Sequence, residues 1–202
     1  MNARKVLKSK AVKLLFLFFT SMLVATASAT VYYSITMEPS VTVTEAPVQF
    51  AQGSDWSKVA GSIGTNSTWC SLSIKAYPNA TLTYEQPLNI SNTVGTSKSI
   101  KLRHVSISPA SGSASVGNFT FIKFVLMDAS GSPVSGGSFN YTTSGNNWNL
   151  PSSMSYKTLP ANTKWIVRIE TKAAAGATKN IAASIVIAVA YKSRESSFSF
   201  LL

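Results

Sequence analysis

The chain has 202 residues but only one cysteine, Cys70, and one histidine, His104. A single cysteine excludes an internal disulfide framework. One cysteine and one histidine are too few for a zinc site with several Cys and His ligands. The scarcity of both residue types also disfavours enzymes built on a Ser-His-Asp or Cys-His arrangement. We expect Cys70 to be a small buried apolar residue and His104 to lie on the exposed phase of a strand.

Acidic residues are equally scarce, and they are scattered along the chain. No two of the seven lie within four residues of each other; they are Glu38, Glu45, Asp55, Glu85, Asp128, Glu170 and Glu195. Clustered oxygen ligands for calcium are therefore absent from the pattern. The sequence predicts no enzyme, no metal and no cofactor. A glycosidase with two carboxylates stays open as an alternative, because distant carboxylates can meet in a fold.

Charged residues make up only 12% of the chain and aromatic residues 10%, which argues against disorder. The formal charge is +11, but five of the 18 basic residues lie within the first thirteen positions. Removing the first 29 residues lowers the charge to +6 and leaves the basic residues dispersed. This distribution is typical of a solvated surface, and we expect no nucleic-acid partner.

The N-terminus has the three parts of a secretory signal peptide. A basic stretch precedes an apolar run at residues 14–25, and Ala27 and Ala29 supply the small residues of a cleavage site before Thr30. The run is too short to span a bilayer as a mature helix. We predict a signal peptide at 1–29, removed on export, and a mature chain that is secreted and not membrane-embedded. An uncleaved anchor is the alternative.

Alternating apolar and polar residues then dominate the sequence. Strand candidates follow one another at short intervals, separated by Gly, Pro and Asn turns, at residues 69–77, 82–90, 99–108, 119–127, 138–143, 154–159, 165–171 and 181–191. Helical hints are confined to residues 55–60 and 171–179. The run at 181–190 does not alternate, which suits a strand covered on both faces or one whose second face a partner covers. We predict an all-β, two-sheet β-sandwich, jelly-roll-like, at residues 46–202.

The segment ahead of this domain, residues 30–45, alternates as well. Its apolar phase consists of Val31, Tyr33, Ile35, Met37, Val41 and Val43, and Pro39 interrupts it. The simplest interpretation is the first strand of the sandwich. The alternative is a donor strand that completes the sheet of the next subunit, which would build a head-to-tail homopolymer.

Five Asn-X-Ser/Thr sequons are candidate N-glycosylation sites in an exported chain. They are Asn66, Asn79, Asn89, Asn118 and Asn140.

The layout resembles the archaeal bundling pilins and the bacterial TasA-type biofilm-matrix fibre subunits. The resemblance is carried by Ala27-Ser28-Ala29 and by the stretches TVYYSITM at 30–37, VTVTEAPVQFAQGS at 41–54 and LNISNT at 88–93. It implies a jelly-roll sandwich that polymerises by N-terminal donor-strand exchange, with the donor role at Val31, Tyr33, Ile35 and Met37.

We therefore expect a structural subunit of an extracellular filament, a pilus or biofilm-matrix fibre, that acts in adhesion. Its partner is another copy of itself, and neighbouring filaments or a cell surface stay open as further contacts. The alternative is a monomeric secreted or membrane-anchored sandwich that binds a ligand or surface.

Overall fold

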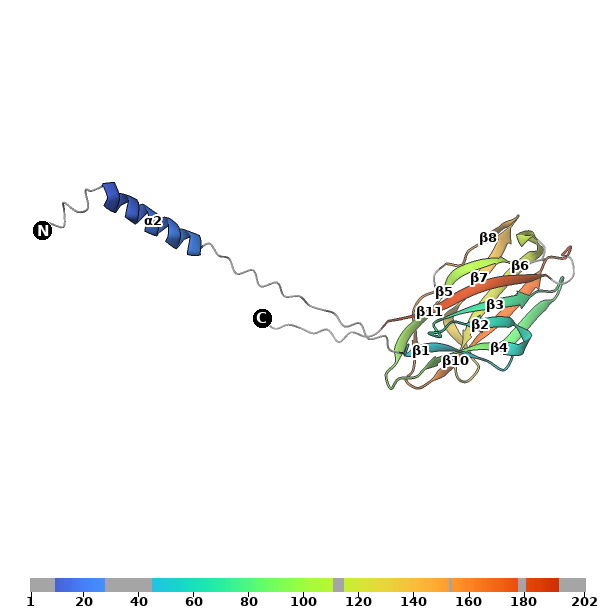
Figure 1. Ribbon diagram of the computed structural model, residues 1–202. Helices are drawn as coiled ribbons and strands as arrows, with labels where there is room; N and C mark the ends of the chain where they lie inside the picture. The colour runs from blue at the N-terminus through green and yellow to red at the C-terminus, as the bar shows by residue number, and fades with distance from the viewer. Residues whose placement is uncertain (1–9, 28–44, 111–114, 153, 178–180, 193–202) are drawn as a thin grey trace. The chain divides into compact units, whose positions relative to one another are not determined.

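The computed structural model describes residues 10–27, 45–110, 115–152, 154–177 and 181–192 (Figure 1). The chain divides into two units, Met1–Val43 and Thr44–Leu202. In the first unit, helix α2 (Lys10–Ala27) contains the apolar run of the predicted signal peptide. By length and hydropathy, no helix in the described part of the chain qualifies as a membrane-crossing segment. The six predicted donor residues, from Val31 to Val43, lie outside the described residues.

The second unit consists of two antiparallel sheets packed face to face (Figure 1), which confirms the predicted all-β sandwich. One sheet, sheet A, has the order β1-β4-β10-β6-β7-β8, and the other, sheet B, has the order β2-β3-β11-β5-β9. The strands of sheet A are β1 (Val48–Gln52), β4 (Thr81–Asn92), β6 (Phe119–Met127), β7 (Pro133–Ser144), β8 (Asn147–Asn149) and β10 (Lys164–Ala173). Those of sheet B are β2 (Ala60–Ile63), β3 (Trp69–Lys75), β5 (Lys98–Pro109), β9 (Lys157–Leu159) and β11 (Ala182–Lys192).

Eight of these strands have the order of a jelly roll. The row β3-β11-β5-β9 faces the row β4-β10-β6-β7, and the chain crosses between the sheets at most connections. Strands β1 and β2 extend the two sheets on one side of the sandwich, and the hairpin strand β8 lies at the other end of sheet A.

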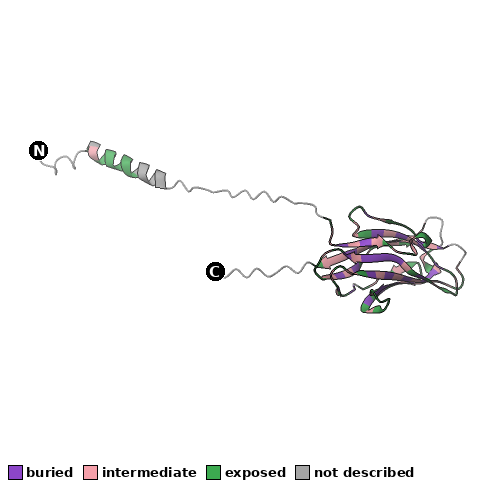
Figure 2. Cartoon of the chain, turned by 90° about the horizontal axis from the view of Figure 1, so that it is seen from below, coloured by how far each residue is buried: buried purple, intermediate pink, exposed green. Residues whose placement is uncertain are grey.

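The core follows from period-two alternation, as Figure 2 shows along the strands. In β3, β10 and β11 every second side chain is buried between the sheets. Strand β11 was expected to be covered on both faces. Its inner residues, among them Ile185 and Ile187, are buried, whereas outer residues such as Val186 and Ala188 are only half-buried. The apparent loss of alternation arises because small apolar residues occupy its outer face.

The strand predictions were incomplete in three places and the helix predictions wrong in one. Strands β1, β2 and β8 were not predicted, since they have only five, four and three residues. The hint at 55–60 corresponds to a single 3-10 turn, Trp56–Lys58. The hint at 171–179 was wrong because Thr171–Ala173 completes β10, where Thr171 and Ala173 are buried. The strand expected at 154–159 is shortened to Lys157–Leu159.

Candidate functional site

Strand β5 is left without a partner along most of one edge. One edge of β5 pairs with β11 from Ser99 to Pro109. On the other side it pairs only with the three residues of β9, and this pairing ends at Ile100. Among the described residues no strand pairs with the outer edge of β5 from Lys101 to Pro109. Half of the backbone amides and carbonyls of this stretch point to that edge.

On the opposite side of the sandwich, where β1 and β2 are the edge strands, a loop joins the two sheets. There the Phe50 amide in β1 donates a 2.6 Å hydrogen bond to the Ser67 carbonyl in the loop between β2 and β3. In the same loop the Thr68 carbonyl accepts a 2.8 Å bond from the Val189 amide of β11. This loop therefore connects the two sheets through the backbone on that side, and the unpaired stretch of β5 lies on the other side.

The connection from β8 to β9 crosses the open side without forming a strand. Met154 is buried and fills the core between the sheets. The Tyr156 ring makes cation–π contacts with two ammonium groups, since Lys101 Nζ lies 4.9 Å and Lys192 Nζ 4.6 Å from its centroid. These cation–π contacts anchor the connection against β5 and β11 at its C-terminal end.

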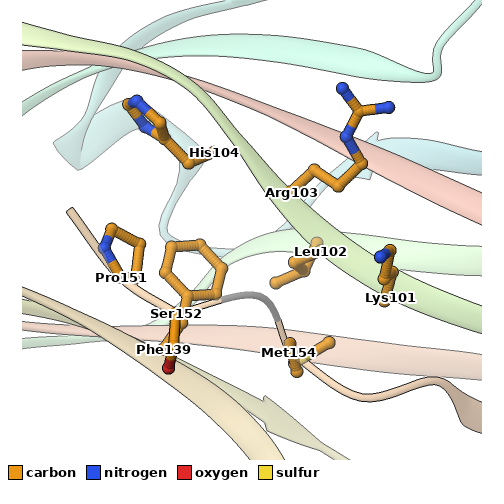
Figure 3. A pocket seen from close by; sticks show the side chains of 8 residues that line it. All are labelled: Lys101, Leu102, Arg103, His104, Phe139, Pro151, Ser152 and Met154. Carbon is orange, nitrogen blue, oxygen red and sulfur yellow. The ribbon is translucent and has the colours of Figure 1, made fainter.

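A pocket of about 230 Å³ lies between this connection and β5. Its residues on β5 are Lys101, Leu102, Arg103 and His104, and the others are Phe139, Pro151, Ser152 and Met154. Figure 3 shows the β5 residues on one side and Pro151 and Met154 on the other, with the Arg103 guanidinium pointing away from the apolar residues. The pocket combines apolar walls from Leu102, Phe139 and Met154 with a basic margin.

His104 contributes to this site in a way that the sequence did not predict. We expected an exposed side chain, but His104 is half-buried, and its Nδ1 atom lies 2.9 Å from the Tyr141 hydroxyl of sheet A. The predicted orientation was wrong because Ile100, Leu102 and His104 alternate along β5 and share its inward face, on which Ile100 and Leu102 are buried. Burial lowers the pKa of His104 and raises that of Tyr141, so the uncharged forms are favoured. The contact joins the two sheets next to the pocket.

An aromatic cluster lies behind this contact. Phe139 stacks on Phe124 with ring centroids 4.9 Å apart, and Tyr141 meets the Trp148 ring edge-on at 6.3 Å. The buried indole N–H of Trp148 has no hydrogen-bond acceptor in the described part of the chain. The cluster gives the open side a rigid apolar interior.

The described acidic residues that make contacts have structural roles. Asp55 Oδ2 accepts the Glu85 and Gln86 amides at 2.9 and 3.2 Å, while its Oδ1 pairs with Lys58 at 2.8 Å. The Lys58 contact, helped by these amides, lowers the pKa of Asp55. The Asp128 carboxylate accepts the hydroxyl and amide of Ser130 in its own turn. Within the described ranges no three His, Cys, Asp or Glu side chains gather to hold a metal ion.

Glu170 belongs to an ion-pair group on sheet A, with the Arg168 guanidinium at 2.8 Å and the Lys123 ammonium at 3.8 Å. Cys70 is fully buried, as expected, and burial raises the pKa of its thiol to about 12. The raised pKa keeps the buried Cys70 thiol protonated, so it is not activated as a nucleophile.

The candidate glycosylation sites differ in access. Asn66, Asn79 and Asn140 are exposed, and Asn118 is half-buried. Asn89 is buried, and its amide donates a 2.9 Å hydrogen bond to the Gln52 carbonyl of β1. A glycan on Asn89 is incompatible with this packing, so only the other four sequons stay candidates.

No protein-family model matches the chain, and no curated protein matches it in sequence.

Proposed function

We propose that this chain is the structural subunit of a secreted, cell-surface filament whose subunits polymerise head to tail by donor-strand complementation. In this proposal residues 1–29 direct export and are removed. Residues 30–45 form a donor extension with Val31, Tyr33, Ile35, Met37, Val41 and Val43 on its inward phase. The filament serves adhesion and contacts between cells or with a matrix.

The observation that supports this proposal best is the unpaired edge of β5, on the side of the sandwich that the loop with Ser67 and Thr68 does not join. An exposed edge of this length is a template for pairing with another chain, and soluble proteins usually protect such edges. The sequence ahead of the domain supplies a segment with the alternation of a strand. A segment near a terminus can leave its own subunit, and such an exchange does not close, so it builds a filament.

The pocket beside β5 favours a second candidate. A monomeric, secreted or membrane-anchored sandwich could bind a small ligand between the apolar walls and the basic margin formed by Lys101 and Arg103. This candidate predicts a stable monomer and no filaments.

Filaments formed by the unsubstituted chain separate the two candidates, and deleting residues 30–37 from the full-length chain then tests the donor role. We expect the variant to be exported as a monomer that forms no filaments, because it lacks the inward row from Val31 to Met37. Negative-stain microscopy and size-exclusion chromatography of the secreted material provide the measurement. A matched control, Ser34→Ala with Thr36→Ala, changes only the polar phase and should form filaments. Filaments of normal length from the deletion variant would refute the donor role.

A further inference from the structure

We propose that the acceptor site is the outer edge of β5 from Lys101 to Ser108, where residues 30–37 of a second copy add as a strand in the row begun by β9. This inference rests on the proposed function and names the surface on which the neighbouring subunit binds.

The first argument is the length of the free edge. Strand β9 pairs with Lys98, Ser99 and Ile100 and then ends, whereas β5 continues for nine residues to Pro109. The inward apolar row Val31 to Met37 and its flanking residue Thr30 span eight residues, as does the stretch from Lys101 to Ser108. At about 3.3 Å per residue, both measure about 26 Å. A strand of this length would pair with the edge and leave little of it uncovered.

The second argument is a loss of burial along this edge. His104 and Ile107 of β5 lie opposite Ile187 and Ile185 of β11. Both isoleucines are completely buried, but His104 and Ile107 are only half-buried. Val105, at the register shift between them, is 51% exposed. The inner face of β5 therefore lacks cover on the side where a further strand would lie, and the inward row of the donor would supply it.

The third argument is the fit of the donor residues to this surface. A cavity of about 150 Å³ accommodates a benzene ring, so the pocket of about 230 Å³ is large enough for one aromatic side chain. Tyr33 is the one aromatic residue on the inward phase of residues 30–37. The only charged residue in residues 30–43 is Glu38, and β5 carries Lys98, Lys101 and Arg103. The charges are complementary, which favours this edge over a neutral one.

The other described edges fit less well. Strand β7 pairs with β6 along one edge, and its other edge has no described partner from Pro133 to Tyr141, but its inward residues Phe139 and Tyr141 are already buried. Gly136 has a φ of +61° and lies against Lys157, which interrupts that edge. The remaining edge strands are short, since β1 has five residues, β2 four, and β8 and β9 three each. In β1 the Phe50 amide is already bonded to the Ser67 carbonyl.

Engineered disulfides in the full-length chain test the assignment. Ser34 lies on the outward phase of the donor, and Arg103, Ser106 and Ser108 lie on the outer face of β5, opposite Ala188, Val186 and Ser184. We combine Ser34→Cys with Arg103→Cys, Ser106→Cys or Ser108→Cys, one at a time. Ser62→Cys on the exposed outer face of β2 is the matched control. Cys70 stays in place, since it is buried and forms little thiolate.

Filaments are verified by negative-stain microscopy, oxidised mildly and separated on a non-reducing denaturing gel. We expect a ladder of covalent oligomers with at least one of the three β5 positions and none with Ser62→Cys. Filaments that give no ladder with any β5 position, or a ladder with Ser62→Cys, would overturn the acceptor assignment and leave the filament function standing. The absence of filaments from the unsubstituted chain would refute the proposed function, and the acceptor site with it.

Discussion

At the scale of single residues, His104 is a strand residue without a recognisable motif that contacts the opposite sheet through Tyr141. It lies between Arg103 and Val105, both exposed, yet its phase turns it toward Tyr141 of the opposite sheet. In the neutral ring, an unprotonated Nδ1 atom can accept a hydrogen bond from the Tyr141 hydroxyl. In the protonated ring, Nδ1 can only donate a hydrogen bond to the hydroxyl oxygen. Protonation would also add a positive charge beside Lys101 and Arg103, which line the same pocket.

The stability of the sandwich should therefore depend on pH through His104. Burial holds its folded-state pKa below the ordinary value of 6.5, so the unfolded chain binds this proton more readily. The free energy of unfolding should fall as the pH is lowered through 6.5 toward 5, and chemical denaturation at several pH values measures it. His104→Gln should flatten this dependence. Asp55 and Asp128 do not contribute to the change between pH 6.5 and 5, because their pKa values are lowered from 3.8 and they titrate below this range. An unchanged pH dependence in His104→Gln would contradict the assignment.

At the scale of secondary-structure elements, the short strand β9 determines where the open edge begins. The first residue of β9, Lys157, lies opposite Ile100, so the open edge begins where the irregular connection with Pro151 leads into β9. Pro160 follows Leu159, which lies opposite Lys98 at the other end of β9. Proline lacks a backbone N–H and cannot donate to a sheet ladder. Asn92 fixes the end of β9 in space, since its amide donates to the carbonyls of Thr96 at 2.9 Å and Pro160 at 2.8 Å.

Asn92→Ala should loosen this corner. Asn92 is buried, and its removal leaves the Thr96 and Pro160 carbonyls without their donor. Thr96 and Pro160 are exposed residues, so water can replace part of the lost donor. We therefore expect the free energy of unfolding in urea to fall by about 0.5–1.5 kcal/mol for each hydrogen bond lost. Asn66→Ala is the matched control, because Asn66 is exposed and accepts only the Thr68 amide. Equal stability of the two variants would show that Asn92 does not hold the corner.

At the scale of the whole molecule, the sandwich is asymmetric. One side is joined through the loop that carries Ser67 and Thr68, and the other is spanned by the His104–Tyr141 contact and the irregular connection that ends at Tyr156. In the proposed filament each subunit would supply the strand that closes the open side of its neighbour. The contact between subunits would then resemble the interior of one domain, which makes it sensitive to single apolar residues.

Tyr33→Ala should weaken the filament if the Tyr33 ring occupies the pocket beside Phe139. Truncating a buried aromatic residue to Ala costs about 3–5 kcal/mol, and here the loss falls on every contact between subunits. We expect filaments of Tyr33→Ala to dissociate at lower temperature than the unsubstituted ones, as measured by light scattering. Tyr32→Ala on the outward phase is the control and should change little. Equal dissociation temperatures for both variants would place the ring elsewhere.

The sequence by itself determined the all-β class, because period-two alternation specifies strands with one buried face regardless of how they pair. It determined most of the long strands, such as β6 (Phe119–Met127), and the burial of Cys70. Only the tertiary structure decided which edge stays unpaired, because pairing depends on residues distant in the sequence, such as Ile100 with Lys157. The contact between His104 and Tyr141 has the same origin, since it forms only when the two sheets are packed together.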